Sequence, residues 1–185
     1  MSLEHAILGF LNYKPFSGYD LKKMFDNSVR HFWPADQSQI YRTLGRLAEK
    51  GWTDVELVEQ ADRPDRKVYH LTEDGKSELH CWLTGPISME EHRSPPLVQI
   101  FFAGQLSDEE ILVKFRLGAD MLRAQLGQYE HVPAYIEEYS RMVQSPRETF
   151  CWMLTLESGL AMARSQLEWM ESVVQRIENG QIPQM

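Results

Sequence analysis

Apolar positions in the first 85 residues recur at the spacing of α-helices in four short segments. The third of these has Asp36 or Ser38 as its candidate N-cap and ends at Glu49, before Gly51. The other three expected helices cover residues 3–11, 18–28 and 73–83.

Two short runs between the third and fourth helices alternate apolar and polar positions, as strands do, at residues 55–57 and 68–71. The segment between them, residues 62–67, is polar and predicts a hairpin loop. Three helices, a two-stranded wing and one further helix predict a winged helix-turn-helix.

The second half of the chain shows only helical patterning. Ser107 and Glu110 form a capping box at the start of one helix, and Pro133 is expected to end or kink that helix. Pro146 begins a second helix, in which apolar residues alternate steps of three and four. They are Met153, Leu156, Leu160, Ala163, Leu167, Met170, Val174 and Ile177.

These eight residues, called the C-terminal stripe from here on, have the 3.5-residue mean spacing of a coiled coil. At 1.5 Å per residue the stripe is about 36 Å long. It predicts a dimerisation surface. The alternative is packing on the chain's own helix over residues 112–129, and both contacts can coexist because Phe150, Leu154 and Ala161 mark a second apolar face.

Glycine and proline at residues 84–88 separate the two halves. We expect a winged-helix domain over residues 1–85, a linker over residues 86–96 and a helical domain over residues 97–185. The predicted fold class is mainly α, with long C-terminal helices in a coiled-coil-like arrangement.

Composition excludes several classes of protein. The chain has 185 residues, 43% of them apolar, so a core needs no disulfide or metal. Cys81 and Cys151 are far apart, which indicates buried thiols in a reducing compartment, and we expect a cytoplasmic protein. No run approaches the ~18 apolar residues of a membrane span, and the start lacks a signal-peptide pattern.

The net charge of −8 opposes nucleic-acid binding only when it is taken over the whole chain. Residues 1–85 hold 11 basic and 13 acidic residues, whereas residues 86–185 hold 8 and 14. A local basic surface is therefore compatible with the first half.

Basic residues of the first half gather on the third helix and in the hairpin. Arg42, Arg46 and Lys50 are spaced by four and share one helix face, called the basic row below. A recognition helix presents its first residues to base edges, and flanking cations bind phosphates. This pattern predicts DNA binding, the alternative being an ordinary solvated face. The candidate DNA-binding residues are Ser38, Gln39, Tyr41, Arg42, Arg46, Lys50, Arg63, Arg66 and Lys67.

Five segments of the first half carry a family resemblance: residues 6–9 (AILG), 18–21 (GYDL), 39–47 (QIYRTLGRL), 50–51 (KG) and 66–75 (RKVYHLTEDG). In these segments the chain resembles the winged-helix domain of the PadR family of bacterial transcription regulators. From Pro95 onward it resembles the helical C-terminal region of the virulence-activator branch of that family.

The resemblance implies a homodimer that binds an inverted-repeat operator in double-stranded DNA, usually as a repressor, through a dimer made by the C-terminal helices. Some members respond to a small aromatic or amphipathic effector. Aromatic and methionine side chains of the second half would suit such a pocket. We favour their interpretation as core and dimer contacts.

Enzymatic functions have no support in the sequence. The six histidines show no metal-ligand spacing such as HExxH, and nucleotide-binding glycine patterns and GxSxG are absent from the sequence. We expect no catalytic residues, metal or cofactor, and no membrane partner. The alternative function is a helical protein–protein adaptor whose winged helix does not bind DNA, which the salt dependence of DNA binding would distinguish.

Overall fold

The structure, a computed structural model, describes residues 2–30, 32–59, 66–87 and 94–183. It divides into two compact units, Met1–Ser88 and Met89–Met185. The boundary falls inside the segment that we expected to be a linker. Pro95 and Pro96, which we placed at the end of that linker, instead form the first turn of a helix, where proline's missing N–H costs nothing.

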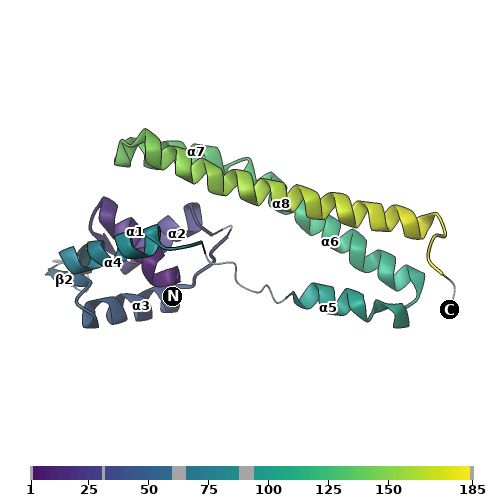
Figure 1. Cartoon of the computed structure of the whole chain (residues 1–185), viewed down its shortest axis with the longest axis horizontal. Coiled ribbons are helices and arrows are strands. Elements are labelled where there is room, and N and C mark those ends of the chain that lie inside the picture. The colour runs from purple at the N-terminus through teal and green to yellow at the C-terminus, as the bar shows by residue number, and fades with distance from the viewer. Residues whose placement is uncertain (1, 31, 60–65, 88–93, 184–185) are drawn as a thin grey trace. The chain divides into compact units, whose positions relative to one another are not determined.

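The first unit packs three helices around one core, with a small sheet and a fourth helix. Ile7, Leu21, Ile40, Leu44 and Leu47 are fully buried, one apolar stripe from each of the first three helices. The elements are α1 (Ser2–Tyr13), β1 (Phe16–Ser17), α2 (Gly18–Asn27), α3 (Gln37–Glu49), β2 (Thr53–Val58), β3 (Arg66–Leu71) and α4 (Glu73–Thr84) (Figure 1).

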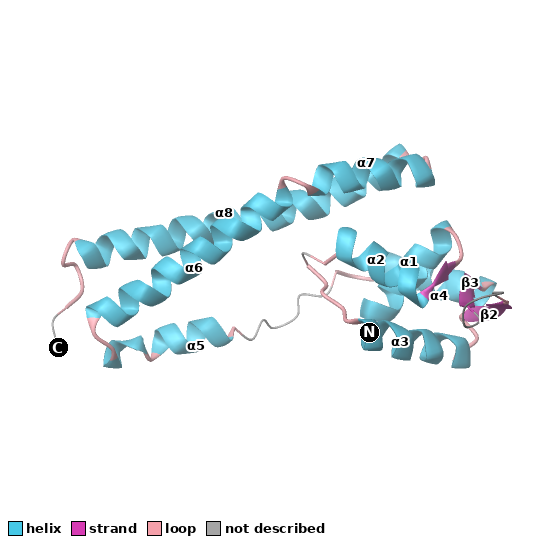
Figure 2. Ribbon diagram, turned by 180° about the vertical axis from the view of Figure 1, so that it is seen from behind, coloured by secondary structure: helices cyan, strands magenta, loops and turns pink. Residues whose placement is uncertain are grey.

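The sheet has three antiparallel strands in the order β1-β3-β2. Strands are drawn in magenta in Figure 2. The wing is the expected hairpin of β2 and β3. The structure adds the short strand β1 to it, because Phe16 of β1 pairs with Tyr69 of β3. The sequence did not predict β1, because its two residues are too few to show the alternation of a strand. Pro15, just before them, indicates instead an interruption of secondary structure.

Helix starts in the first unit follow the expected local chemistry. Ser17, Asp36 and Thr72 accept hydrogen bonds from backbone N–H groups in the first turns of α2, α3 and α4, so Asp36 is the one of the two candidate residues that caps α3. Gly51, with φ of +72°, follows the end of α3 in the left-handed conformation that glycine tolerates best.

All secondary-structure elements in the described residues of the second unit are helices. The predicted capping box of Ser107 and Glu110 is confirmed at the start of its second helix. That helix ends at Tyr129, and Pro133 lies in the first turn of the next helix. The elements are α5 (Pro95–Phe101), the 3₁₀ turn η1 (Ala103–Gln105), α6 (Asp108–Tyr129), α7 (Val132–Val143) and α8 (Pro146–Glu178) (Figures 1 and 2).

The C-terminal stripe packs within its own chain, on α6 and α7, so the alternative that we left open describes its main contact. Leu156 and Ala163 are buried with Leu122, Tyr129 and Ile136 in one core cluster. Leu160, Leu167 and Met170 pack against that cluster, Ile177 is buried and Val174 is half-buried, whereas Met153 is 40% exposed. The sequence alone does not distinguish packing against a second copy from packing within the same chain, because both contacts require the same apolar face.

Both cysteines are exposed, contrary to the expectation of buried thiols. Cys81 lies in the last turns of α4 and Cys151 near the start of α8, on the sides of these helices that other elements of the same unit leave open.

Candidate nucleic-acid interface

Helix α3 presents one fully buried face and one exposed face. Ile40, Leu44 and Leu47 fill the core, while Tyr41, Arg42 and Arg46 are exposed. Residues three or four positions apart share one face of a helix, so Ile40, Leu44 and Leu47 are buried together. Tyr41, Arg42 and Arg46 lie between them in the sequence and therefore face away from the core. This exposed face is the centre of the candidate interface.

Ser38 and Gln39 have a structural role that their selection as DNA contacts did not anticipate. The Asp36 carboxylate accepts hydrogen bonds from the Gln39 N–H (2.7 Å) and the Ser38 hydroxyl (2.6 Å). The Gln39 side-chain oxygen accepts in turn from the Asp36 N–H (3.0 Å), which completes a capping box. The bond from Ser38, followed by that from Gln39, lowers the pKa of Asp36. The motif D-x-x-Q at residues 36–39 is the sequence signal for this arrangement.

Tyr41 lies against the start of α2. A Cβ atom at Gly18 would stand 2.6 Å from Cε1 of the Tyr41 ring, so the ring occupies the space that glycine leaves empty. The ring is 43% exposed. Tyr69 of β3 is buried, and burial, followed by a contribution from Tyr41, raises the pKa of Tyr69. Gly18 thus sets the position of a candidate base-reading side chain.

The basic row is not uniform. Arg42 is exposed, and Arg46 donates from Nη2 to Oγ1 of Thr43 (3.1 Å). Nε of Arg46 lies 3.8 Å from the Glu4 carboxylate of α1, and Nζ of Lys50 lies 2.9 Å from it. Sequence reasoning missed Glu4, although a carboxylate in the apolar stripe of α1 was a visible signal.

The wing contributes Arg66 and Lys67 at the start of β3, and both are exposed. Arg66 forms an ion pair with Asp20 of α2, which connects the base of the wing to the helix layer. Arg63, the remaining candidate in the hairpin, lies outside the described residues.

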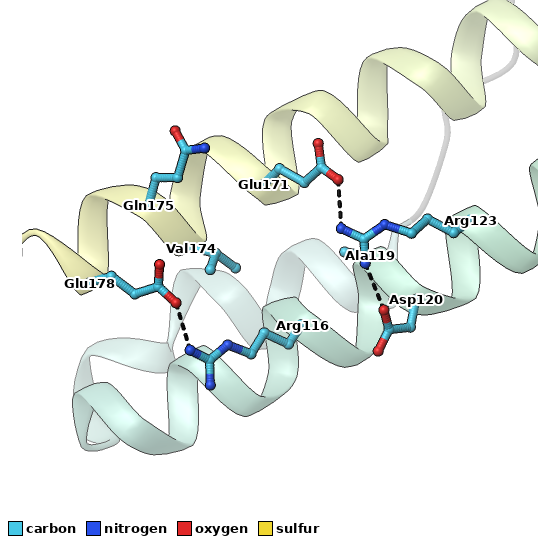
Figure 3. Close-up of a pocket in the computed structure, with 8 residues that line it drawn as sticks. All are labelled: Arg116, Ala119, Asp120, Arg123, Glu171, Val174, Gln175 and Glu178. Carbon is cyan, nitrogen blue, oxygen red and sulfur yellow. Dashed lines mark hydrogen bonds and ion pairs between the residues drawn. The ribbon is translucent and has the colours of Figure 1, made fainter.

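In the second unit, charged residues join α6 to α8 beside the apolar core. Arg116 pairs with Glu178 and Arg123 with Glu171, each at 2.6 Å, and Arg123 also pairs with Asp120 at 2.6 Å (Figure 3). The hydrogen bond that Arg123 donates to Glu171 is the main cause of the raised pKa of Arg123. These side chains line a hollow between α6 and α8, and both of the arginines in it already have carboxylate partners.

A second, mainly apolar hollow lies among η1, α6 and the end of α8. The rings of Phe115 and Trp169 meet edge to face there, with centroids 5.6 Å apart. Ile100 and Ile111 add apolar surface, and Arg176 is a cation in the lining.

Two apolar rows of the second unit remain exposed on the single chain. Val113, Leu117 and Met121 follow one face of α6, while Phe150, Leu154 and Met162 follow one face of α8. The latter contains the second face that the sequence indicated with Phe150 and Leu154.

The described residues contain no group of three or more His, Cys, Asp or Glu side chains arranged to bind a metal ion. Among the helices that the structure describes, none has the combined length and hydropathy that a membrane span requires.

Comparison with known proteins matches both parts of the chain. Residues 7–81 match the PadR-like family of transcriptional regulators, and residues 92–178 match the C-terminal domain of virulence activator alpha. The negative transcriptional regulator PadR of Bacillus subtilis is 32% identical over an alignment of 182 positions, which covers 95% of this chain and 97% of that protein.

Two solved structures of a member of this family are similar to this chain over nearly its full length. Bacillus subtilis PadR in complex with operator DNA matches with a TM-score of 0.80 and 29% identity, over 96% of this chain and 99% of that one. The same regulator with p-coumaric acid matches with a TM-score of 0.75 and 28% identity, over the same shares of the two chains. On the strength of these family matches and the near-complete overlap with PadR, this chain belongs to the PadR-like family of transcriptional regulators and is not an enzyme.

Proposed function

We propose that the chain is a dimeric, sequence-specific repressor that binds an inverted-repeat operator in the cytoplasm. The observation that carries the proposal is the exposed face of α3, where Tyr41, Arg42 and Arg46 stand opposite a fully buried face. The similarity to a negative regulator, and to a relative solved on operator DNA, supports repression through DNA binding.

In this proposal residues 1–85 bind DNA, with α3 in the major groove. Ser38, Gln39, Tyr41 and Arg42, near the N-terminal end of α3, lie closest to base edges, as a recognition helix requires. Arg46 would bind a backbone phosphate. The wing cations Arg63, Arg66 and Lys67 would contact phosphates beside the groove. Phosphate contacts fix the position of the protein on the duplex and do not read the base sequence.

Residues 97–185 form the dimer in the same proposal. The C-terminal stripe is mostly covered by α6 and α7. We therefore assign the contact between two copies to the exposed rows of α6 and α8, together with Met153 of the stripe. Exposed apolar rows on neighbouring helices are typical of an interaction surface.

We further propose that an aromatic acid releases the repressor from DNA. The relative solved with p-coumaric acid supports this ligand class. The apolar hollow with Phe115, Trp169 and Arg176 offers an aromatic wall and a cation for a carboxylate. Titrating p-coumaric acid into the DNA complex should release the DNA, and unchanged binding at saturating acid would contradict this part.

The central experiment is selection of bound duplexes from a random-sequence library, followed by titration of the selected and of a random duplex at several salt concentrations. A repressor should prefer the selected duplex by roughly 10³-fold or more, with log K falling steeply with log salt. Weak, unselective association with a flat salt line would instead favour the protein–protein adaptor.

A further inference from the structure

Glu4 is a carboxylate in the interior of the winged-helix unit. It lies on the face of α1 that also buries Ile7, Leu8 and Leu11, and its side chain is only 7% exposed. Removing a carboxylate from water is costly unless a cation accompanies it. Glu4 therefore needs a permanent partner from within the fold.

The partners are two of the three cations of the basic row. Nζ of Lys50 lies 2.9 Å from one Glu4 oxygen, and it also lies 4.3 Å from the centroid of the Trp52 ring. Nε of Arg46 lies 3.8 Å from the other Glu4 oxygen. The ammonium of Lys50 is thus held by a buried carboxylate on one side and an aromatic face on another.

The environment of Arg46 differs from that of Lys50. Its Nη2 atom donates to Thr43 and its Nε atom faces Glu4, while the side chain as a whole is 53% exposed. A guanidinium has five N–H donors in a rigid plane, so two inward contacts leave others for a phosphate. Arg46 can bind DNA without leaving either internal partner.

We infer that Glu4 is a positioning residue for DNA binding, one that withholds Lys50 from the phosphates and orients Arg46 toward them. Movement of Lys50 to a phosphate would leave Glu4 buried with only the longer contact to Arg46. This inference rests on the proposed function. It also removes Lys50 from the predicted DNA contacts, although Lys50 shares a helix face with Arg42 and Arg46.

The ion pair between Asp20 and Arg66 provides an internal comparison. The Asp20 side chain is 35% exposed, compared with 7% for Glu4. Water can replace Arg66 around Asp20, so Arg66 is free to exchange partners with DNA. Burial of the acid, and not the presence of an ion pair, decides which cations are withheld.

The test is the salt dependence of binding by the full-length protein to a random-sequence duplex of about 30 base pairs, or three helical turns. Each phosphate contact contributes about 0.9 to the slope of log K against log salt. The variants are Arg46→Met, Glu4→Gln and the double variant Glu4→Gln/Lys50→Met. Lys76→Met, on the exposed side of α4, is the control for a lost surface charge.

Arg46→Met should flatten the slope by about 0.9 for each protomer on the duplex. Glu4→Gln should steepen the slope by a similar amount, because Lys50 is released. The double variant and Lys76→Met should keep the wild-type slope. The double variant exchanges a buried ion pair for neutral groups of similar shape, a change that folds generally tolerate, and circular dichroism checks this.

A double variant with a slope flatter than the wild type would overturn the inference, since Lys50 would then contact phosphate despite Glu4. A Glu4→Gln variant that folds but keeps the wild-type slope would overturn it as well, because the pair would be purely structural. A flat line for the wild-type protein is a different outcome, which overturns the proposed function and this inference together.

Discussion

At the scale of single residues, the predicted DNA contacts differ in what else they bind. Ser38 and Gln39 hydrogen-bond to Asp36, the N-cap of α3, while Lys50 balances a buried carboxylate and Arg42 is exposed. Residue type and helix face were readable from the sequence. The partner of Lys50 was not, because Glu4 lies 46 positions away in the sequence.

Gly18→Ala should reduce discrimination between operator and random DNA. The new Cβ would stand 2.6 Å from the Tyr41 ring, so the ring must leave its place at the start of α2. A good base contact contributes on the order of 1–3 kcal/mol to discrimination. Titrations on both duplexes measure the effect, with Gly9→Ala, whose Cβ meets nothing within 4 Å, as the control. Equal losses on both duplexes would make Tyr41 a positioning residue only.

Arg66→Ala should weaken binding to every duplex and flatten the salt slope by about 0.9 per protomer, because one phosphate contact is lost. Asp20→Asn should leave the slope unchanged, since its carboxylate is partly hydrated and does not withhold Arg66. Anisotropy titrations at several salt concentrations measure both slopes. If Arg66→Ala kept the wild-type slope, Arg66 would not belong to the interface.

At the scale of elements, short polar motifs determine where a helix starts, but they do not determine which other helix it packs against. The capping boxes at Asp36 and Ser107 satisfy backbone N–H groups within one turn, so each motif acts wherever the helix lies. The long helix α8, by contrast, is covered on the face that meets α6 and α7 and exposed at Phe150, Leu154 and Met162.

The α6 capping box should make stability of the helical unit depend on pH. Hydrogen bonds from the Ser107 backbone and then its hydroxyl lower the pKa of Glu110. A pKa lowered in the folded state contributes stability above its unfolded value, and that contribution is lost as pH falls through the folded pKa. Glu110→Gln should therefore lower the urea midpoint at neutral pH and approach the wild type in acid.

Urea titrations from neutral pH down through the carboxyl range test this expectation. Glu109→Gln, a change at a residue that is not one of the two capping-box residues, controls for loss of an acid near the same helix terminus. A difference between Glu110→Gln and the wild type that stays constant with pH would contradict a role for the charged carboxylate.

At the scale of the whole molecule, the dimer that we propose and the fold of the helical unit use different faces of the same helices. We expected Leu160 and Leu167 to face a partner copy, but both pack on the core cluster of their own chain. Leu117 and Met121 on α6 are 57% and 67% exposed. Tests of the dimer should therefore target α6, and not the C-terminal stripe.

Leu117→Lys/Met121→Lys should give a folded monomer whose operator affinity is lower by about two orders of magnitude, because linked half-sites gain through effective concentration. Leu160→Lys/Leu167→Lys should instead melt the helical unit, since charge would enter its core. Light scattering and circular dichroism on the same samples separate the two results. Gln99→Lys/Gln105→Lys adds the same charge at exposed polar positions of α5 and η1, outside both apolar rows, and should stay dimeric. A Leu117→Lys/Met121→Lys protein that remains dimeric would place the interface elsewhere.

The sequence by itself determined where most helices begin, which faces are apolar and the winged helix-turn-helix order. It did so because caps, helical period and strand alternation act over a few neighbouring residues. Ser17, Asp36, Thr72 and Ser107 are such local signals. The resemblance to the PadR family rested on equally short segments.

Only the tertiary structure decided which distant surfaces meet. It added β1 to the sheet through Phe16 and Tyr69, placed Glu4 beside Lys50, and covered the C-terminal stripe with α6 and α7. An apolar face or a charged side chain carries no record of its partner along the chain. The free energy of burial and of ion pairing is released only when the elements pack, so these contacts are properties of the folded molecule.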